Sequence, residues 1–568
     1  MITDTSNSRN KRDIKDMSTN PEIYIKNLTF SDGTVLPLSH SDIVVFTGPN
    51  NVGKSQAIKD ILDIFKNVHI THNVITKLES EFCGVFDNSY FDARFKYIYG
   101  NYQYSDLVFR DYEDCSNAWK SHSLPRMGRG FAQLLSTESR LILANTTNSI
   151  NVLNDLPTHP LHFLYTKDSL ESELSSLVER AFGEHVTLNR GMGANIALHV
   201  GRQVTAPIGK DRVSEEYLRE LSKVPLVDTQ GDGIRSFIGV LLYLLTSEKS
   251  VTLIDEPEAF LHPPQARILG QMLAEKATKQ LFVSTHSEDF LKGVIEKGGD
   301  RVKVLRITRN GAINPVSILD SSQIKTIWND PLLKFSNLLS GLFHQKVVIC
   351  EADTDCRFYQ AILDSISSEE DVVKPDVLFT YCGGKERLKV MAAALSPLRV
   401  PISVIADFDI LDDEDKFKSL CDTMGIDWDE IGPKWKVVFE YVRSQRPQLE
   451  TSEVKTEVNR ILDSVKENHL PKKVNDELRK VLKQSSAWGK AKYVGSAFLM
   501  GESHKAFTEI DLACRKKGLF IVPVGQLESF YRSSSSHGTK WVNEVLESVD
   551  LRNSEELNKA REFVKAFI

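Results

Sequence analysis

The sequence has no apolar run long enough to cross a membrane. A transmembrane helix needs about 20 apolar residues, whereas the longest apolar stretch in these 568 residues covers only positions 238–245. The first twenty residues are polar and charged, unlike a secretory signal. We therefore expect a cytoplasmic protein with no membrane partner, and a disordered lead over residues 1–20.

Cysteine is scarce and irregularly placed. The chain has 7 cysteines, an odd number, and none of them forms a C-x-x-C pair. Disulfide frameworks and zinc ribbons both need regularly spaced cysteine pairs. The pattern excludes both and indicates reduced thiols inside a cell.

Neither sign of charge dominates. Lysine and arginine number 70 against 77 aspartates and glutamates, for a net charge of −7. This balance excludes a chain coated in basic surface. It does not exclude a DNA partner, because a nuclease needs only a local basic groove and uses carboxylates to hold metal ions. The length exceeds what one hydrophobic core normally holds, so we expect two or three domains.

A glycine-rich loop follows the first β-rich runs. Residues 48–55 read GPNNVGKS and fit the pattern G-x-x-x-x-G-K-[S/T], between a β-rich run and a helical pattern. The amides of such a loop point at phosphate oxygens, and the helix dipole favours the anion. The pattern predicts ATP binding by Gly48, Asn50, Asn51, Gly53, Lys54 and Ser55. Lys54 would contact the β- and γ-phosphates and Ser55 would hold Mg²⁺; the alternative is a chance glycine-rich turn.

Two later segments have the order expected of an ABC-type ATPase. Residues 251–257, VTLIDEP, form a β-rich run that ends in two carboxylates. Asp255 would bind Mg²⁺ and Glu256 would orient the attacking water. Residues 282–287, FVSTHS, place His286 at a strand end, where it would contact the γ-phosphate. The alternatives are a solvated acidic turn and a polar residue that happens to end a strand.

A third segment, residues 230–236, reads QGDGIRS and precedes an apolar helical run. ABC ATPases carry a signature loop at this place. Gly231, Gly233 and Ser236 would offer their amides to phosphate at a helix start, on nucleotide held by another subunit. The segment therefore predicts a dimer; the alternative is a glycine turn that caps a buried helix.

A second strand–helix alternation begins at residue 346 and predicts a second parallel α/β sheet. Glu351 and Asp355 follow its first strand, VVIC, while Asp407 and Asp409 follow a later one, ISVIA. Residues i and i+2 of a strand face the same way, and neighbouring strands would bring all four carboxylates into one cleft. Oxygen ligands without His or Cys favour Mg²⁺ or Mn²⁺, and such a cluster suits phosphodiester cleavage. Taken singly, acidic residues at strand ends are common surface features.

The ordered series GPNNVGKS, QGDGIRS, LIDEPEAFLHP, STHS, ICEADTD and IADFD resembles the OLD (overcoming lysogenization defect) family. The nuclease subunit of the Gabija antiphage system and retron-linked effectors are similar. The resemblance implies an α/β protein: an ABC-type P-loop ATPase domain over residues 21–342, followed by a Toprim Rossmann-like domain over 343–568. It also implies a helical insertion that dimerises the ATPase at about 70–220, and a helical insertion of the Toprim domain at about 412–510.

The resemblance also implies roles for the acidic residues. Glu351 would act as a metal ligand or general base, and Asp355, Asp407 and Asp409 as metal ligands. After the fourth strand, Glu528 would hold a second ion and Lys540 would stabilise charge on the phosphate; the alternative for both is an ordinary exposed helix and turn. The chain departs from the family at Ala352, where Toprim modules usually have glycine.

The function expected from this resemblance is an ATP-regulated, Mg²⁺- or Mn²⁺-dependent DNA endonuclease in antiphage defence. It would act as a homodimer or larger homo-oligomer, with a partner protein or retron nucleic acid encoded nearby. The alternative is a structural DNA-binding ATPase of the SMC or repair type whose Toprim module does not cut. The lack of long heptad arms argues against it. A mixed-charge tract at 451–492 is either a solvated helical face or a guide for DNA backbone.

Overall fold

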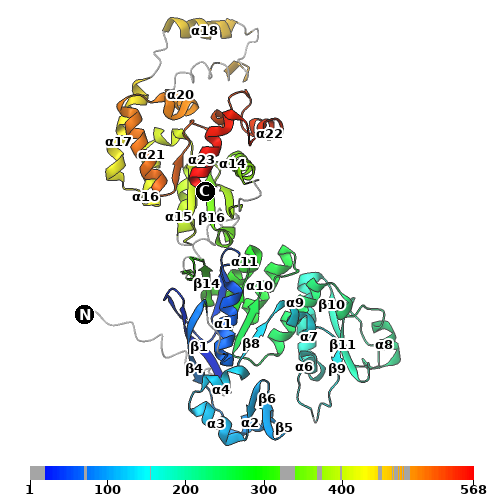
Figure 1. The fold of residues 1–568 in the computed structure, drawn as a ribbon. Coiled ribbons are helices and arrows are strands. Elements are labelled where there is room, and N and C mark those ends of the chain that lie inside the picture. Colours follow the sequence, from blue (N-terminus) through cyan, green and yellow to red (C-terminus); the bar gives the residue numbers. More distant parts are fainter. Residues whose placement is uncertain are drawn as a thin grey trace, which may run out of the picture. The chain divides into compact units, whose positions relative to one another are not determined.

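The computed structural model describes residues 20–68, 73–153, 155–319, 339–367, 374–396, 399–445, 451–463, 465, scattered positions between 471 and 478, and 487–568. Residues 1–19, nearly all of the expected lead, lie outside the described residues. The chain divides into two compact units, Met1–Thr326 and Ile327–Ile568 (Figure 1). The sequence places this boundary near residue 342, and residues 320–338, within which the boundary at 326/327 falls, are not described.

The N-terminal unit is built on a six-stranded sheet with the order β15-β14-β3-β13-β12-β8. Only β15 runs antiparallel to its neighbour. β3 is buried at every residue and β12 at all but its last, as expected of parallel strands covered on both faces. The strands are β3 (Ile43–Thr47), β8 (Ala132–Leu135), β12 (Val251–Asp255), β13 (Gln280–Ser284), β14 (Val302–Ile307) and β15 (Val316–Leu319). The helices beside them are α1 (Lys54–Lys66), α9 (Asp232–Thr246), α10 (Pro263–Lys276) and α11 (Glu288–Gly298).

A second, antiparallel sheet with the order β2-β1-β4 packs against this core. Its strands are β1 (Glu22–Phe30), β2 (Val35–Pro37) and β4 (Ile75–Cys83). The buried side chain of Gln280 on β13 joins the two sheets, because it accepts from Ile25 N (2.8 Å) and donates to Ile25 O (2.7 Å). One apolar core is shared by α1, β1 and one face of the central sheet.

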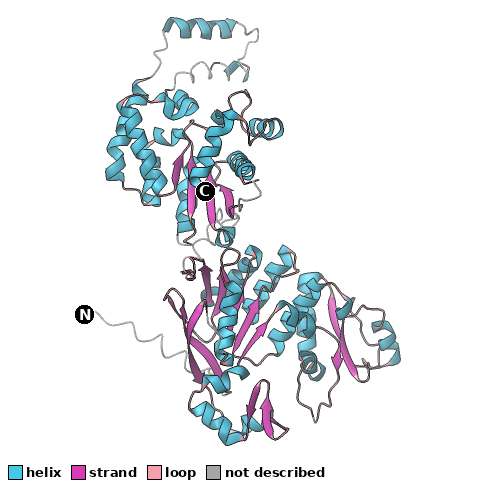
Figure 2. Ribbon diagram, in the orientation of Figure 1, coloured by secondary structure: helices cyan, strands magenta, loops and turns pink. Residues whose placement is uncertain are grey.

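The insertion expected to be helical is mixed, as Figure 2 shows by its magenta strands. It contains a hairpin sheet β5-β6-β7 and a second sheet β10-β11-β9, and β8 within it joins the central sheet. The hairpin arises from aromatic residues that pair across strands, such as Tyr97 with Tyr102, around a turn at Gly100. Its elements are α2 (Asn88–Arg94), β5 (Lys96–Ile98), β6 (Asn101–Tyr104), β7 (Leu107–Phe109), α3 (Tyr112–Lys120), α4 (Leu124–Met127), α5 (Thr137–Leu143), β9 (Thr147–Asn148), α6 (Pro160–Thr166), α7 (Asp168–Phe182), β10 (His185–Asn189), β11 (Asn195–Gly201) and α8 (Glu215–Leu221).

The C-terminal unit has a four-stranded parallel sheet with the order β17-β16-β18-β19. Its strands are β16 (Lys346–Cys350), β17 (Val377–Tyr381), β18 (Ile402–Ala406) and β19 (Leu519–Ile521), the four β-rich runs of the sequence. One face packs with α14, α22 and α23 in an aromatic core that includes Phe358, Trp541 and Phe563. The helices are α14 (Asp353–Ile366), α15 (Leu388–Leu395), α16 (Glu414–Met424), α17 (Trp428–Ser444), α18 (Thr451–Asp463), α20 (Ala487–Val494), α21 (Glu502–Lys516), α22 (Thr539–Ser548) and α23 (Asn558–Phe567).

The elements described between β18 and β19 are all helices joined by loops, while the expected bounds of the insertion at 412–510 stay a prediction. No helix among the described residues is long and apolar enough to span a membrane.

Candidate functional site

The glycine-rich loop at 48–55 connects β3 to α1. Gly48 (φ 138°) and Gly53 (φ 99°) adopt backbone conformations that favour glycine. A Cβ on Gly48 would also lie 2.2 Å from the carbonyl oxygen of Ile307 on β14. The loop curls around Lys54, whose Nζ donates to Gly48 O (2.8 Å) and Pro49 O (2.7 Å). The loop therefore has the shape and lysine position that the sequence pattern predicts.

Asp255 joins three elements at the carboxyl edge of the central sheet. Its Oδ1 accepts from Ser55 Oγ (2.9 Å) on α1 and also from Ser284 Oγ at the end of β13. Because the strands run parallel, their last residues meet at this edge. The two residues expected to share a magnesium ion, Ser55 and Asp255, thus lie in direct contact.

Glu256 and His286 complete the arrangement beside the loop. Glu256 has a positive φ of 46°, and its Oε1 lies 3.4 Å from His286 Nε2. Burial and the charge of Lys54 lower the pKa of His286, so its neutral imidazole is favoured near neutral pH. A hollow of about 650 Å³ is lined by both residues and by the loop: Asn50, Asn51, Val52, Gly53, Lys54, Ser55, Gln56, Glu256, His286 and Arg309.

The hollow also touches the segment between β14 and β15. Arg309 lines it, and Asn314 Nδ2 donates to Val52 O (2.6 Å) in the loop. These contacts connect the loop to the last described strand of the N-terminal unit. The sequence pattern gave no signal for either residue, since neither lies in a nucleotide-binding motif.

Arg140 on α5 is a buried residue of the site that the sequence patterns do not reveal. Its side chain is 0% exposed and donates to Asp255 O (2.7 Å), Glu256 O (2.7 Å) and Ser236 Oγ (2.7 Å). Burial lowers the pKa of its guanidinium, against the opposing charges of nearby carboxylates. Arg140 therefore fixes the backbone that carries the carboxylates of Asp255 and Glu256.

The segment at 230–236 forms the start of α9, with Gly231 as its N-cap. A Cβ on Gly233 would lie 2.7 Å from the carbonyl oxygen of Phe260, so this glycine allows a close backbone approach. Ser236 is fully buried, and its hydroxyl accepts from Arg140 instead of facing solvent. The contact with Arg140 does not support phosphate binding by the Ser236 side chain. Amide contacts from Gly231, Gly233 and Ser236 to nucleotide stay predictions.

In the C-terminal unit, Glu351 and Asp407 meet at the carboxyl edge of the parallel sheet. They directly follow the neighbouring strands β16 and β18, and Asp407 N donates to Glu351 Oε1 (3.0 Å). The amides of Gly383 and Gly384, after β17, donate to Glu351 O (3.0 and 2.9 Å). Hydrogen bonds to Glu351 therefore connect the ends of three strands, β16, β17 and β18.

Asp355 lies in the first turn of α14, where its Oδ2 accepts from Ala352 N (2.9 Å). Ala352 has φ −134°, an extended conformation open to any residue, so alanine is tolerated where the family usually has glycine. The charge of Asp407 contributes to the raised pKa of Asp355, as does that of Glu528. Asp355 therefore belongs to the same cluster.

Two lysines form ion pairs with Asp409, and one of them also pairs with Asp407. Lys492 Nζ on α20 lies 3.0 Å from Asp407 Oδ2 and 3.1 Å from Asp409 Oδ2. Lys385 Nζ lies 3.2 Å from Asp409 Oδ2 and 3.2 Å from Asp412 Oδ1. The sequence showed Lys492 only as one cation in the mixed-charge tract at 451–492. Its place at the carboxylates depends on a long-range contact, which no local pattern reveals.

The buried carboxylates resist ionisation. Burial, followed by the charge of Asp407, raises the pKa of Glu351 to about 8 and that of Asp355 to about 7. Burial also raises the pKa of Asp407 to about 6, although Lys492 opposes the shift. Asp409 Oδ1 is buried and has no hydrogen-bond partner among the described residues. Such a set of oxygens fits a divalent cation, which would satisfy their excess negative charge.

The side chains are not arranged in ready metal-binding geometry. Within the described ranges, no three His, Cys, Asp or Glu side chains are grouped so that they could hold an ion. The ammonium group of Lys492 bridges Asp407 and Asp409, in a place where a metal ion would otherwise contact both carboxylates. Metal binding by Glu351, Asp355, Asp407 and Asp409 stays a prediction that needs this lysine to move.

Glu528 acts on the acidic cluster, whereas Lys540 is exposed to solvent. Glu528 raises the pKa of Asp355 and Asp407, and its Oε1 accepts from Gly538 N (3.0 Å). Lys540 is exposed at the start of α22, and no carboxylate of the described chain lies within ion-pair distance of it. The structure thus brings Glu528 near the cluster, while Lys492 and Lys385 are lysines in contact with it.

Comparison with known families agrees with both sites. Residues 43–291 match a family of AAA domains, whose description also names the AbiEii toxin of Type IV TA systems. Residues 342–409, which include Glu351 and Asp407, match the overcoming lysogenization defect protein-like TOPRIM domain. The second match agrees with the resemblance to the OLD family that the sequence shows. The N-terminal unit is a P-loop ATPase domain of AAA/ABC type, followed by a TOPRIM domain, as the sequence predicts.

A curated protein similar to this chain is the OLD nuclease of Thermus scotoductus (strain ATCC 700910 / SA-01). The two are 25% identical over 198 residues, which is 32% of this chain and 36% of the relative. The match thus spans about a third of the relative's length. The narrower likeness to Gabija and retron-linked proteins stays a prediction.

Solved structures similar to this chain include SMC head domains. An SMC head bound to the C-winged helix domain of ScpA is 13% identical and covers 53% of this chain and 99% of its own, with a TM-score of 0.34. The SMC head domain from Thermotoga maritima is 12% identical and covers 54% of this chain and 100% of its own, with a TM-score of 0.28. These TM-scores are low, and nothing about partners follows from them.

Arg140→Lys is expected to slow ATP turnover without preventing ATP binding. Lysine cannot donate to two carbonyls and a hydroxyl in the fixed fork of arginine, so the backbone of Asp255 and Glu256 loses its support. We expect kcat to fall by about tenfold or more, and stability to fall by about 1–3 kcal/mol, measured by steady-state ATPase assay and thermal unfolding. Arg110→Lys, at an exposed position, is the control. An unchanged kcat would show that Arg140 does not position the site.

The raised pKa of Glu351 predicts a stability that falls with rising pH in a chelating buffer. Folded Glu351 keeps its proton to about pH 8, whereas the unfolded chain loses it near the ordinary value of 4.5. The stabilisation is therefore present at low pH and lost as the pH rises through 8. Glu351→Gln, which mimics the protonated form, should exceed wild type at high pH by on the order of 2 kcal/mol. Denaturant unfolding across the pH range tests this, with Glu547→Gln as control; parallel curves would contradict it.

Lys492→Met is expected to tighten Mn²⁺ binding, because the ammonium competes for Asp407 and Asp409. We expect the Kd to fall by about tenfold, equivalent to about 1.4 kcal/mol, in calorimetric titration of DNA-free protein. Lys490→Met on the same helix is the matched control, since Lys490 is exposed. Weaker or unchanged binding by Lys492→Met would show that this lysine does not compete with the ion.

Proposed function

We propose that this chain is an ATP-regulated, divalent-cation-dependent DNA endonuclease that serves antiphage defence in the cytoplasm. The observation that carries the proposal is the contact between Asp407 N and Glu351 Oε1, which brings two acidic strand ends to one edge of the TOPRIM sheet. The printed name of the similar OLD nuclease supports the same activity. The description of the matched TOPRIM domain, which names the overcoming lysogenization defect protein, supports this activity as well.

The acidic cluster supplies the residues that such a reaction needs. Asp355, Asp407, Asp409 and Glu528 offer only oxygen ligands, which favours Mg²⁺ or Mn²⁺. When bound there, the ion would supply activation of water and stabilisation of charge on the phosphate. Glu351 has a pKa near neutrality, which suits a group that accepts the proton of an attacking water. Lys492, once released from the carboxylates, and Lys540 would stabilise negative charge on the DNA backbone.

The ATPase site would regulate this cluster. Lys54 and the loop amides would bind the phosphates, Ser55 and Asp255 would hold Mg²⁺, and Glu256 with His286 would act at the γ-phosphate. Regulation is supported by the contact between the loop and the β14–β15 segment, which precedes the TOPRIM unit in the chain. Gly231 and Gly233 would act on nucleotide in a second copy, so we propose a homodimer or larger homo-oligomer. A partner protein or retron nucleic acid encoded nearby would complete a defence system.

The decisive experiment is a cleavage assay on plasmid and linear DNA with Mg²⁺ or Mn²⁺, with and without ATP or a non-hydrolysable analogue. Asp407→Asn removes a buried carboxylate at the centre of the cluster and should reduce cleavage by about a hundredfold or more. ATP turnover should persist, because the P-loop lies in the other unit. Asp422→Asn on α16, an exposed aspartate of the same unit, is the control and should cut normally. Full cleavage by Asp407→Asn would remove the nuclease site from this place.

One observation favours a second function, a structural DNA-binding ATPase with a TOPRIM module that does not cut. Lys492 already neutralises Asp407 and Asp409, and the described residues hold no ready metal group. In that case wild-type protein would bind DNA in an ATP-dependent way, yet leave it intact with either ion. The same assay, combined with Mn²⁺ titration, separates the two functions.

A further inference from the structure

The turn that follows β12 carries a further glutamate, Glu258, to which the sequence patterns give no role. Glu256 and Phe260, on either side of it, have positive φ values of 46° and 70°. Such values are uncommon outside glycine and are kept only where the surroundings fix the backbone. Two hydrogen bonds close the turn, from Ala259 N to Glu256 O (3.0 Å) and from Leu261 N to Glu258 O (2.9 Å). The backbone of Glu258 is therefore held in a defined place.

The carboxylate of Glu258 contacts the segment that follows β13. Its Oε1 accepts from Thr285 Oγ1 (2.7 Å) and from His286 N (2.8 Å). Thr285 is 0% exposed, so its hydroxyl needs a partner within the protein. Thr285 Oγ1 in turn accepts from Ser287 N (3.0 Å), the residue that caps α11. One oxygen atom of Glu258 therefore connects the segments that follow two neighbouring strands.

This connection determines where His286 lies. His286 Nε2 is 3.4 Å from Glu256 Oε1, and both residues line the hollow beside the glycine-rich loop. The imidazole is attached to a backbone whose amide donates to Glu258, so the carboxylate fixes the point from which the ring reaches into the hollow. A misplacement of about 1 Å is enough to slow a reaction strongly.

Arg140 and the donors of the β13 segment stabilise the Glu258 carboxylate. The guanidinium of Arg140 donates to Glu256 O (2.7 Å), and the charge of Glu258 opposes the effect of burial on the pKa of Arg140. Burial raises the pKa of Glu258, whereas its hydrogen bonds with Thr285 and His286 oppose the rise. The carboxylate therefore has both a nearby cation and two donors that keep it in place.

We propose that Glu258 is a positioning residue for ATP hydrolysis, which acts through Thr285 and His286. Its acceptor oxygen holds the imidazole of His286 beside Glu256, where the γ-phosphate would lie. Among the residues that the structure describes, those lining the nucleotide hollow do not include Glu258, so it acts without touching the nucleotide. The inference rests on the ATPase reaction proposed above and is independent of DNA cleavage.

Steady-state ATPase kinetics of the full chain test the proposal. Glu258→Leu removes the acceptor, and kcat should fall by about tenfold or more while the KM for ATP changes by less than about threefold. Glu258→Gln keeps an acceptor oxygen without the charge, so kcat should stay within about threefold of wild type. An unchanged kcat in Glu258→Leu, or an equal loss in Glu258→Gln, would overturn the proposal.

A double-mutant cycle separates the positioning of His286 from a general effect on folding. In protein that carries His286→Ala, the further change Glu258→Leu should lower kcat by less than about twofold, because the group through which it acts is already missing. Full additivity of the two losses would contradict the proposal. If Glu258→Leu does not fold, Thr285→Val decides, since it keeps the side-chain shape and removes one donor. It should lower kcat by about threefold or more, and an unchanged value would overturn the role of this contact.

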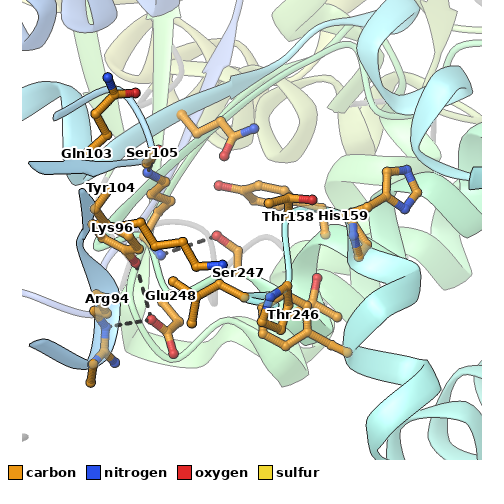
Figure 3. A pocket seen from close by; sticks show the side chains of 18 of the residues that line it. Arg94, Lys96, Gln103, Tyr104, Ser105, Thr158, His159, Thr246, Ser247 and Glu248 are labelled. Carbon is orange, nitrogen blue, oxygen red and sulfur yellow. Dashed lines mark hydrogen bonds and ion pairs between the residues drawn. The ribbon is translucent and has the colours of Figure 1, made fainter. Parts of the chain in front are cut away.

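Glu248 provides the matched control, in a pocket of about 660 Å³ elsewhere in the same unit (Figure 3). Its Oε2 lies 3.1 Å from Arg94 Nε and accepts from Tyr104 Oη (3.3 Å), so this glutamate also has two partners. The pocket is lined by the β5–β6 hairpin, residues 156–160 and the end of α9, whereas the glycine-rich loop lines the nucleotide hollow. Glu248→Leu should therefore keep the kcat of wild type, and a loss equal to that of Glu258→Leu would overturn the proposal. Wild type without ATP turnover would instead contradict the proposed ATPase reaction, and the inference with it.

Discussion

The hydrogen bond from Asp407 N to Glu351 Oε1 exists because β16 and β18 are adjacent and parallel. Parallel strands end at the same edge of a sheet, so side chains that follow them in sequence meet in space even when they lie 56 positions apart. The N-terminal unit obeys the same constraint, since β3, β13 and β12 deliver the glycine-rich loop, Ser284 and Asp255 to one edge. Both candidate sites depend on this geometry more than on any single residue.

Placing carboxylates together out of water has an electrostatic cost, and each unit offsets it with a buried cation. In the TOPRIM unit, Lys492 and Lys385 approach Asp409 from different elements. In the ATPase unit, Arg140 is held among carboxylates but donates to backbone carbonyls. The lysines contact carboxylate side chains, whereas Arg140 is held by backbone carbonyls and is a fixed part of the scaffold. The two candidate sites therefore differ in how their cations are held.

Local sequence patterns were sufficient for the strands and for the residues at their ends. The glycine-rich loop, Asp255, Glu256, His286, Glu351 and Asp407 are all found next to the elements that the sequence predicts, and the two domain matches confirm the fold class. Arg140 and Lys492 could not be predicted, because their contacts join segments 115 and 83 positions apart. The mixed structure of the insertion was missed for a related reason. Its short strands pair through aromatic side chains, and that pairing is decided by tertiary packing as much as by propensity.

The contact of Gly48 with β14 limits how the glycine-rich loop can move. The backbone of Ile307 leaves no room for a side chain at Gly48, and Asn314 holds Val52 from the next turn. Any displacement of the loop must therefore also shift β14 or the segment between β14 and β15, so the loop and this edge of the sheet form one mechanical unit.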